Sequence, residues 1–302
     1  MDYISELNKS LNELNRVTGL SFQIQPQTDE EAKYALEQLK LLSSAYKEKY
    51  NKIHFLQSLM TDSIPSYYIY ERASRLHIEP EESRVLYLLE TKHGMIETIP
   101  EVIKHLFPPQ PQSYLIPLTD NTYAILCAKR KVDDVHKTAQ MLVDTLNAES
   151  LVHVRVAYSK VMDSLIGLSE AFRETSLALK VGKIFYSEQT IFPYNKLGIG
   201  RLIYRLPYTL CENFLQEVFG STIPEVLDEE LLVSVNKFFQ NNLNIAETSR
   251  QLHMHRNTLI YRLDQVQKLT GLDLRKFEDA MTLKIAFMVM NYLNTERKIP
   301  NE

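Results

Sequence analysis

Residues 252–263 read LHMHRNTLIYRL, and the chain on either side of this stretch carries two amphipathic patterns. Upstream, Asn244 is followed three residues later by Glu247, a spacing typical of a capping box, which predicts the start of a helix of about two turns. Downstream, a second helix is predicted from Arg256 to Thr270, because Gly271 then occupies the position that commonly ends a helix. A short helix, a tight turn and a longer helix predict a helix-turn-helix unit.

The second predicted helix has two unlike faces when its residues are projected at about 100° per residue. An apolar stripe of Leu259, Leu263 and Val266 must pack on the preceding helices. The polar side of the projection, expected to face outward, carries Asn257, Thr258, Tyr261, Arg262 and Gln265. Asn and Gln can pair with adenine, Arg with guanine, and Thr and Tyr can reach base edges or phosphates. This face favours DNA reading, and an exposed helix of an ordinary bundle is the alternative with the same spacing.

The charge along the chain agrees with a DNA-contacting surface at this place. Overall the chain is slightly acidic, with 34 Lys and Arg, 38 Asp and Glu and a net charge of −4, so any attraction to nucleic acid must be local. Between Glu247 and Asp264 the sequence has no acidic residue, and it carries Arg250, Arg256 and Arg262 together with two histidines. A duplex backbone requires a patch of this kind.

The middle of the chain alternates between strand and helix patterns, in the order β-α-β-β-α-β-α. Two short apolar runs on either side of residues 119–121 predict a β-hairpin at its centre. Such an order predicts an α+β layer. The expected strands are 84–89, 114–118, 122–128 and 151–158, and the expected helices are 99–107, 133–147 and 164–181, the last ended by Gly182.

The first sixty residues read as helical, with a 4-3 spacing of mostly apolar residues. This seam predicts either a dimeric coiled coil or an amphipathic helix docked on the next domain. It runs through Ala35, Leu39, Leu42, Tyr46, Lys49, Ile53, Leu56 and Met60. Residues 197–200, LGIG, indicate a hinge, so the predicted domains are a helical segment at 1–63, an α+β domain at 64–196, and a linker with a helical domain at 197–302.

Residues 229–287 resemble the C-terminal helix-turn-helix domain of the PucR/CdaR regulators of purine and sugar-diacid metabolism. The resemblance is carried by residues 252–263 and by LTGLDL at 269–274, and residues 197–203, LGIGRLI, are similar to the linker of that family. It implies a transcription regulator whose recognition helix, about 256–270, enters the major groove of operator DNA. A homodimer or larger assembly is expected because one short recognition helix contacts too few base pairs to define a unique site. The residues implied to contact DNA are His255, Arg256, Asn257 and Thr258 at the helix start, followed by Tyr261 and Arg262, and the projection adds Gln265 to this predicted DNA-binding set.

The middle layer resembles the degenerate GGDEF-like domain that precedes this helix-turn-helix in the same family. An active cyclase carries a Gly-Gly-Asp/Glu-Glu-Phe motif at the central hairpin, where glycine admits phosphate and carboxylates bind metal. Here residues 118–123 read LTDNTY, with one acid and no glycine, and outside this hairpin Glu90 is the only nearby carboxylate that could stand in for a metal ligand. The expected role is therefore dimerisation or effector sensing. The alternatives are a nucleotide-processing, cyclase-like enzyme and a protein-binding adaptor whose helix-turn-helix does not function.

The composition excludes several other classes of function. Cys127 and Cys211 are too few for a disulfide framework, and the scattered histidines lack the spacing of a metal site. The longest apolar runs have six residues, and residues 1–6 do not resemble a signal peptide, so a cytoplasmic protein is predicted. We therefore expect no catalytic residues, cofactor, metal or membrane partner, and we expect double-stranded DNA, a second copy of the chain and a small-molecule effector as partners.

Overall fold

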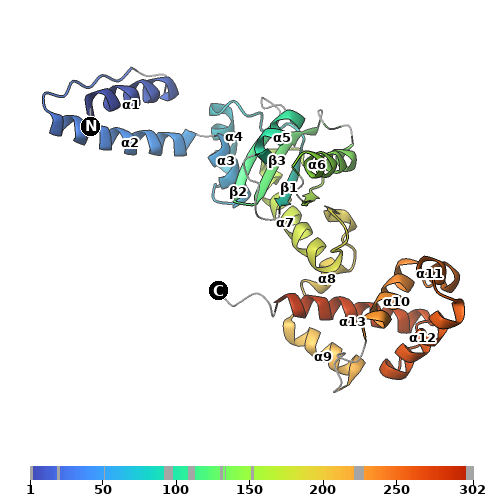
Figure 1. The fold of residues 1–302 in the computed structure, drawn as a ribbon. Helices are drawn as coiled ribbons and strands as arrows, with labels where there is room; N and C mark the ends of the chain where they lie inside the picture. The colour runs from blue at the N-terminus through green and yellow to red at the C-terminus, as the bar shows by residue number, and fades with distance from the viewer. Residues whose placement is uncertain are drawn as a thin grey trace. The chain divides into compact units, whose positions relative to one another are not determined.

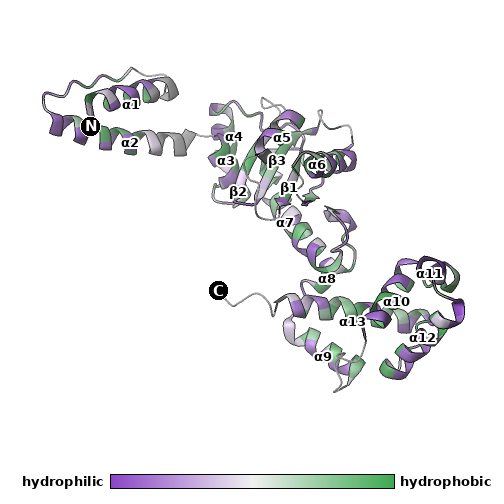
Figure 2. Cartoon of the chain, viewed as in Figure 1, coloured by the Kyte–Doolittle hydropathy of each residue, from purple (hydrophilic) through white to green (hydrophobic). Residues whose placement is uncertain are grey.

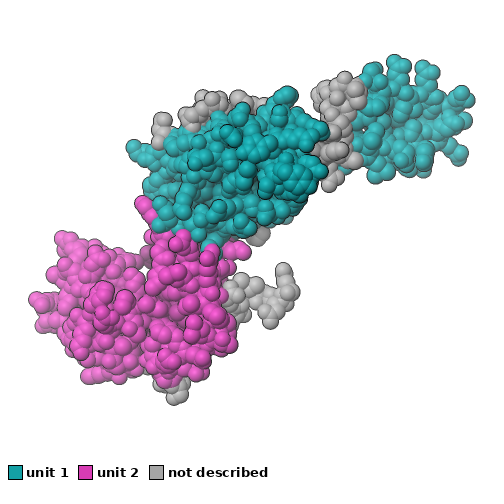
Figure 3. Space-filling model, turned by 180° about the vertical axis from the view of Figure 1, so that it is seen from behind, with its two compact units in different colours: residues 1–179, 190–195 teal, residues 180–189, 196–302 magenta. Residues whose placement is uncertain are grey.

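The computed structural model describes residues 3–18, 21–50, 52–91, 98–107, 113–129, 132, 134–150, 153–220 and 228–296. The chain divides into two compact units, residues 1–179 with 190–195 and residues 180–189 with 196–302 (Figure 3). Helices predominate, a five-stranded sheet lies in the middle of the chain, and the last part is entirely helical (Figure 1). The predicted fold class, mainly α with a central α+β domain and a C-terminal helix-turn-helix domain, is confirmed.

Two helices, α1 (Tyr3–Thr18) and α2 (Asp29–Tyr50), form an antiparallel hairpin at the start of the chain (Figure 1). Its core consists of Leu7, Leu11 and Leu14 from α1 and Leu36 and Leu39 from α2. The connection between the helices is fixed by Asn15, whose Oδ1 accepts from the Phe22 backbone N–H at 2.7 Å.

The seam predicted from Ala35 to Met60 has Leu39, Leu56 and Met60 buried within the chain. Leu42 is exposed, and the buried face of α2 instead carries Leu36, because this face turns toward α1. Residue 51 and the side chains of residues 45–50, which include Tyr46 and Lys49 of the predicted seam, lie outside the described residues; in α3 (Lys52–Met60) Leu56 and Met60 are buried. The helix-to-helix contact of the hairpin therefore decides which of two overlapping apolar spacings is used.

The sheet has the order β2-β3-β1-β4-β5, in which all neighbours are antiparallel except β4 and β5. With helices α5 (Thr98–Leu106) and α6 (Val135–Ser150), the first four strands form a split β-α-β unit of the ferredoxin-like type. The strands are β1 (Arg84–Thr91), β2 (Ser113–Thr119), β3 (Thr122–Ala128), β4 (Val154–Tyr158) and β5 (Ile191–Pro193).

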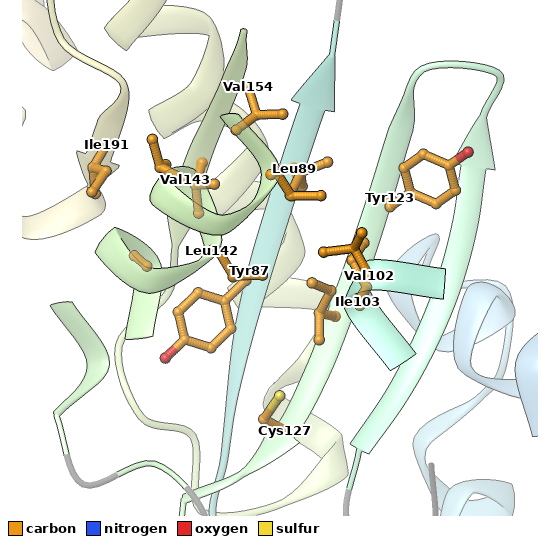
Figure 4. Packing of buried hydrophobic residues seen from close by; sticks show 14 of the residues in the cluster. Tyr87, Leu89, Val102, Ile103, Tyr123, Cys127, Leu142, Val143, Val154 and Ile191 are labelled. Atoms are coloured by element: carbon orange, nitrogen blue, oxygen red, sulfur yellow. The ribbon is translucent and has the colours of Figure 1, made fainter. Parts of the chain in front are cut away.

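Helices α5 and α6 cover one face of this sheet. Figure 4 shows Tyr87 and Leu89 of β1 packed with Ile103 of α5 and Leu142 of α6. Since nearly every residue of β1 is buried, the opposite face is covered as well. The remaining helices of this part are α4 (Ser66–Arg75), a 3-10 turn at Leu165–Gly167 and α7 (Leu168–Phe185), and a second 3-10 turn follows β5 at Tyr194–Lys196.

The prediction that Gly182 ends a helix is wrong, because α7 continues through it to Phe185. A glycine inside a helix costs about 1 kcal/mol relative to alanine. Gly182 is buried, and its carbonyl accepts from the Tyr186 N–H at 2.9 Å, so packing and the continued helical hydrogen bonds offset this cost.

The last part of the chain is helical, and the hydropathy colours in Figure 2 alternate along its helices as amphipathic packing requires. It consists of α8 (Gly200–Ile203), α9 (Tyr208–Phe219), α10 (Glu229–Gln240), α11 (Ile245–Gln251), α12 (Arg256–Thr270) and α13 (Phe277–Glu296). Helix α9 packs on α13 through Cys211, Leu215 and Val289. A second core joins α10, α12 and α13, and it positions the helix-turn-helix. Among the described residues, no helix combines the length and apolar character needed to cross a membrane.

Candidate nucleic-acid interface

The first helix of the predicted helix-turn-helix, α11, begins at Asn244, whose side chain accepts from the Glu247 N–H at 3.1 Å. This is one half of the predicted capping box. The Glu247 carboxylate accepts hydrogen bonds from Arg250 and Gln251, and the Arg250 bond is the main cause that lowers the pKa of Glu247. One carboxylate thus lies within the basic stretch and pairs with one of its arginines.

The turn between α11 and α12 is a Schellman motif with a histidine in the left-handed position. His253 has φ +52°, and its N–H donates to the Arg250 carbonyl at 3.2 Å. The next N–H, from Met254, donates to the Ser249 carbonyl at 3.0 Å. These two bonds reverse the chain within a few residues, which is the tight turn that the sequence predicted.

Helix α12 is capped by His255. The ring nitrogen Nδ1 accepts from the Asn257 N–H at 3.2 Å, and the His255 carbonyl accepts from the Thr258 N–H at 3.0 Å. Since Nδ1 acts as the acceptor, it carries no proton in this arrangement. His255 thus satisfies the N–H groups of Asn257 and Thr258, and the exposed first turn of α12 presents the positive end of the helix dipole to solvent.

Six of the eight residues of α12 that the projection placed lie as predicted, and the other two, Arg262 and Gln265, were expected to face outward and are half-buried. Leu259, Leu263 and Val266 are buried in the core with α10 and α13. Exposed side chains are those of His255, Arg256, Asn257, Thr258 and Tyr261, and the last is 61% exposed. Gln265 is half-buried, and its Nε2 donates to the Tyr261 hydroxyl at 3.3 Å.

The outward position predicted for Arg262 is wrong, since its side chain is only 22% exposed. Its guanidinium pairs with the Glu230 carboxylate on α10, and Nη1 donates to the Ser234 hydroxyl at 2.8 Å. Arg262 lies at the border of the apolar stripe, beside Leu263, and its long side chain reaches across that border to the neighbouring helix. The spacing of Glu230 and Ser234, one helical turn apart on α10, is the sequence signal that could have indicated this contact.

The far end of α12 is held by a second arginine. Arg275, in the turn after Gly271, pairs with Asp264 at 3.0 Å and with Asp273 at 2.7 Å, and it also donates to Gln267 at 3.0 Å. The bond from Arg275 lowers the pKa of Asp273. Asp264, the first acid after the basic stretch, is therefore neutralised within the fold.

The hairpin of the middle domain is tied to the end of β1. Thr119 and Thr122 are paired across it, which leaves Asp120 and Asn121 as the turn. The Thr91 N–H donates to the Asn121 carbonyl at 2.9 Å, and the Asn121 amide donates back to the Thr91 carbonyl at 3.4 Å. Over the part of the chain that the structure describes, no group of three or more His, Cys, Asp or Glu side chains is arranged to hold a metal ion.

A capped short helix, a tight turn and a longer helix with a polar, solvent-facing start define a helix-turn-helix protein. Comparison with known families agrees: the PucR C-terminal helix-turn-helix domain matches residues 231–289, and the GGDEF-like domain matches residues 61–181. Over these two domains the chain is similar to the PucR/CdaR regulators.

Three relatives illustrate the similarity. The purine catabolism regulatory protein of Bacillus subtilis (strain 168) is 29% identical over 142 residues, which are 47% of this chain and 27% of that protein. The carbohydrate diacid regulator of Escherichia coli (strain K12) is 23% identical over 274 residues, 85% of this chain and 70% of that protein. The proline-responsive transcriptional activator PutR of Bacillus subtilis (strain 168) is 29% identical over 132 residues, 42% of this chain and 32% of that protein. The chain thus spans about a quarter of the first relative.

Proposed function

We propose that this protein is a sequence-specific DNA-binding regulator of transcription. The observation that carries the proposal is the solvent-exposed start of α12, where Arg256, Asn257, Thr258 and Tyr261 project away from the core. The names of the relatives, which are regulators, support it.

In this proposal α12 enters the major groove with its N-terminal half. Its 15 residues are roughly 22 Å long, enough to follow a groove about 12 Å wide. Arg256 and the exposed start of the helix face the phosphates, since the positive end of a helix dipole attracts anions. Asn257 and Gln265 are the groups suited to adenine, and Tyr261 and Thr258 complete the contact.

We further propose that two copies of the chain bind together. One short recognition helix contacts too few base pairs to define a unique site, and a two-fold pair doubles the contacts. The outer side of α2 supports association, because Tyr34 and Leu41, seven residues apart, are exposed on the side away from Leu36.

The GGDEF-like domain has a non-catalytic role in this proposal, in pairing or in binding a small-molecule effector. Its hairpin turn carries one acid and no glycine, and Asn121 is engaged by Thr91. A cyclase-like enzyme would instead convert GTP in the presence of magnesium. The same purified protein distinguishes the two functions.

The experiment uses the full chain and a duplex selected by it from a random library. Affinity for this duplex should fall steeply between about 50 and 200 mM salt. Arg256→Gln should weaken binding, and it should reduce by about one the steepness of the salt slope, which is the slope of the logarithm of the binding constant against the logarithm of the salt concentration. Lys276→Gln, an exposed cation beyond the far end of α12, is the matched control and should leave both unchanged. Failure to select any duplex, or GTP turnover without DNA binding, would refute the proposal.

A further inference from the structure

Arg262 makes three bonds to a single turn of α10. Besides the ion pair with Glu230 and the bond to the Ser234 hydroxyl, Nη1 donates to the Glu230 carbonyl at 3.4 Å. The Ser234 hydroxyl, in turn, donates to the same carbonyl at 2.8 Å. Ser234 is completely buried, so this end of the contact lies inside the fold.

These bonds lie beside the apolar seam between α10 and α12 and not within it. Leu259 and Leu263 pack against Leu231 and Val235 along that seam. Apolar contacts are not directional and leave a helix some freedom to rotate about its own axis. A polar contact off the seam, with fixed donor and acceptor directions, removes that freedom.

The residues whose direction depends on this rotation are the proposed DNA-contacting ones. Tyr261 precedes Arg262 directly, and Thr258 lies one turn before it, so both move with the backbone to which Arg262 is attached. A base-reading contact requires donors and acceptors in good hydrogen-bond geometry with one base edge, whereas a phosphate contact carries no sequence information.

We propose that Arg262 is a positioning residue: through Glu230 and Ser234 it fixes the rotation of α12, and it does not itself contact DNA. This inference rests on the proposed function. For Arg262 to bind a phosphate, it would have to leave both partners on α10, one of which is a carboxylate and the other completely buried.

Glu230→Gln gives the decisive test, because the two roles of Arg262 predict opposite signs. If Arg262 acts through Glu230, the variant loses affinity for the selected duplex, by about two- to five-fold, the range for one partly exposed ion pair. If Arg262 contacts DNA, removing its competing carboxylate raises the affinity. Glu229→Gln is the matched control, because it removes the same charge from an exposed residue in the same first turn of α10.

A second readout comes from two properties of DNA binding that a loss of stability alone would not change. They are the dependence of the affinity on salt concentration and the ratio of the affinities for the selected duplex and a scrambled one. Arg262→Gln should leave the salt slope unchanged and narrow the affinity ratio between the selected duplex and a scrambled one. Arg256→Gln should instead lower the slope by about one. Thermal unfolding of each variant identifies any that has lost its fold.

Three outcomes are distinguishable. The positioning role is supported if Glu230→Gln has a lower affinity for the duplex than Glu229→Gln and if Arg262→Gln has the salt slope of the wild type. A gain of affinity in Glu230→Gln, or a slope reduced by about one in Arg262→Gln, overturns it and leaves the proposed function intact. If the wild-type protein selects no duplex, the proposed function fails and the positioning role fails with it.

Discussion

Leu263 and Tyr261 lie two residues apart on α12 and on opposite faces, with exposed fractions of 2% and 61%. Their substitution by alanine should therefore give opposite patterns of effect on stability and on DNA binding. Leu263→Ala removes three carbons from the core of α10, α12 and α13, which costs about 2–5 kcal/mol when the side chain is buried. For a domain of roughly 100 residues this lowers Tm by about 10 °C or more.

Tyr261→Ala removes a ring that is mostly in solvent. The hydrogen bond that its hydroxyl accepts from Gln265 at 3.3 Å joins two side chains on the same side of α12, so the free energy of unfolding should change by about 0.5 kcal/mol or less. Affinity for the selected duplex should fall roughly five- to ten-fold, corresponding to about 1–1.4 kcal/mol of binding free energy.

Both quantities are measured on the full chain, Tm by circular dichroism and affinity by fluorescence anisotropy at a temperature where each variant is folded. Under these conditions folded Leu263→Ala should retain most of its affinity. The assignment of the two faces is refuted if Tyr261→Ala lowers Tm as much as Leu263→Ala, or if Leu263→Ala leaves Tm unchanged.

Three further predictions concern single contacts. Arg84 is 1% exposed at the start of β1 and pairs with Glu82, so Arg84→Ala should cost about 3–5 kcal/mol in chemical unfolding, whereas Arg75→Ala, at a surface ion pair, should cost about 1 kcal/mol or less. Glu247→Gln releases Arg250, so the affinity for DNA should rise and should depend more steeply on the salt concentration. In the wild type the pKa of Glu247 is lowered, so the contribution of Glu247 to stability is present above the ordinary glutamate pKa and is lost as the pH falls through the lowered value. An acid titration of helix content in the wild type and the variant would detect this loss. His253→Gly should raise the free energy of unfolding by up to about 1 kcal/mol and raise Tm accordingly, because glycine adopts the left-handed conformation without strain. An unchanged or lower Tm would contradict this prediction.

Much of the fold follows from local patterns. The helix predicted at 256–270 and the strands predicted between 84 and 128 begin and end within a few residues of their predicted bounds, because caps, Gly271 and apolar periods act over one or two turns. The departures have a common cause. Helix α7 continues through Gly182 because the surrounding residues pack on it, and contact with α1 determines which face of α2 is buried.

For the candidate site, the sequence determined which residue types lie near each other on one helix and which of them are apolar. This information sufficed to orient Leu259 and Leu263 inward and Asn257 and Tyr261 outward, because the period of a helix fixes those directions. Only the tertiary structure decided the place of Arg262. A long, flexible side chain at the border of two faces takes the direction of its strongest available partner, and that partner, on α10, is 32 residues away along the chain.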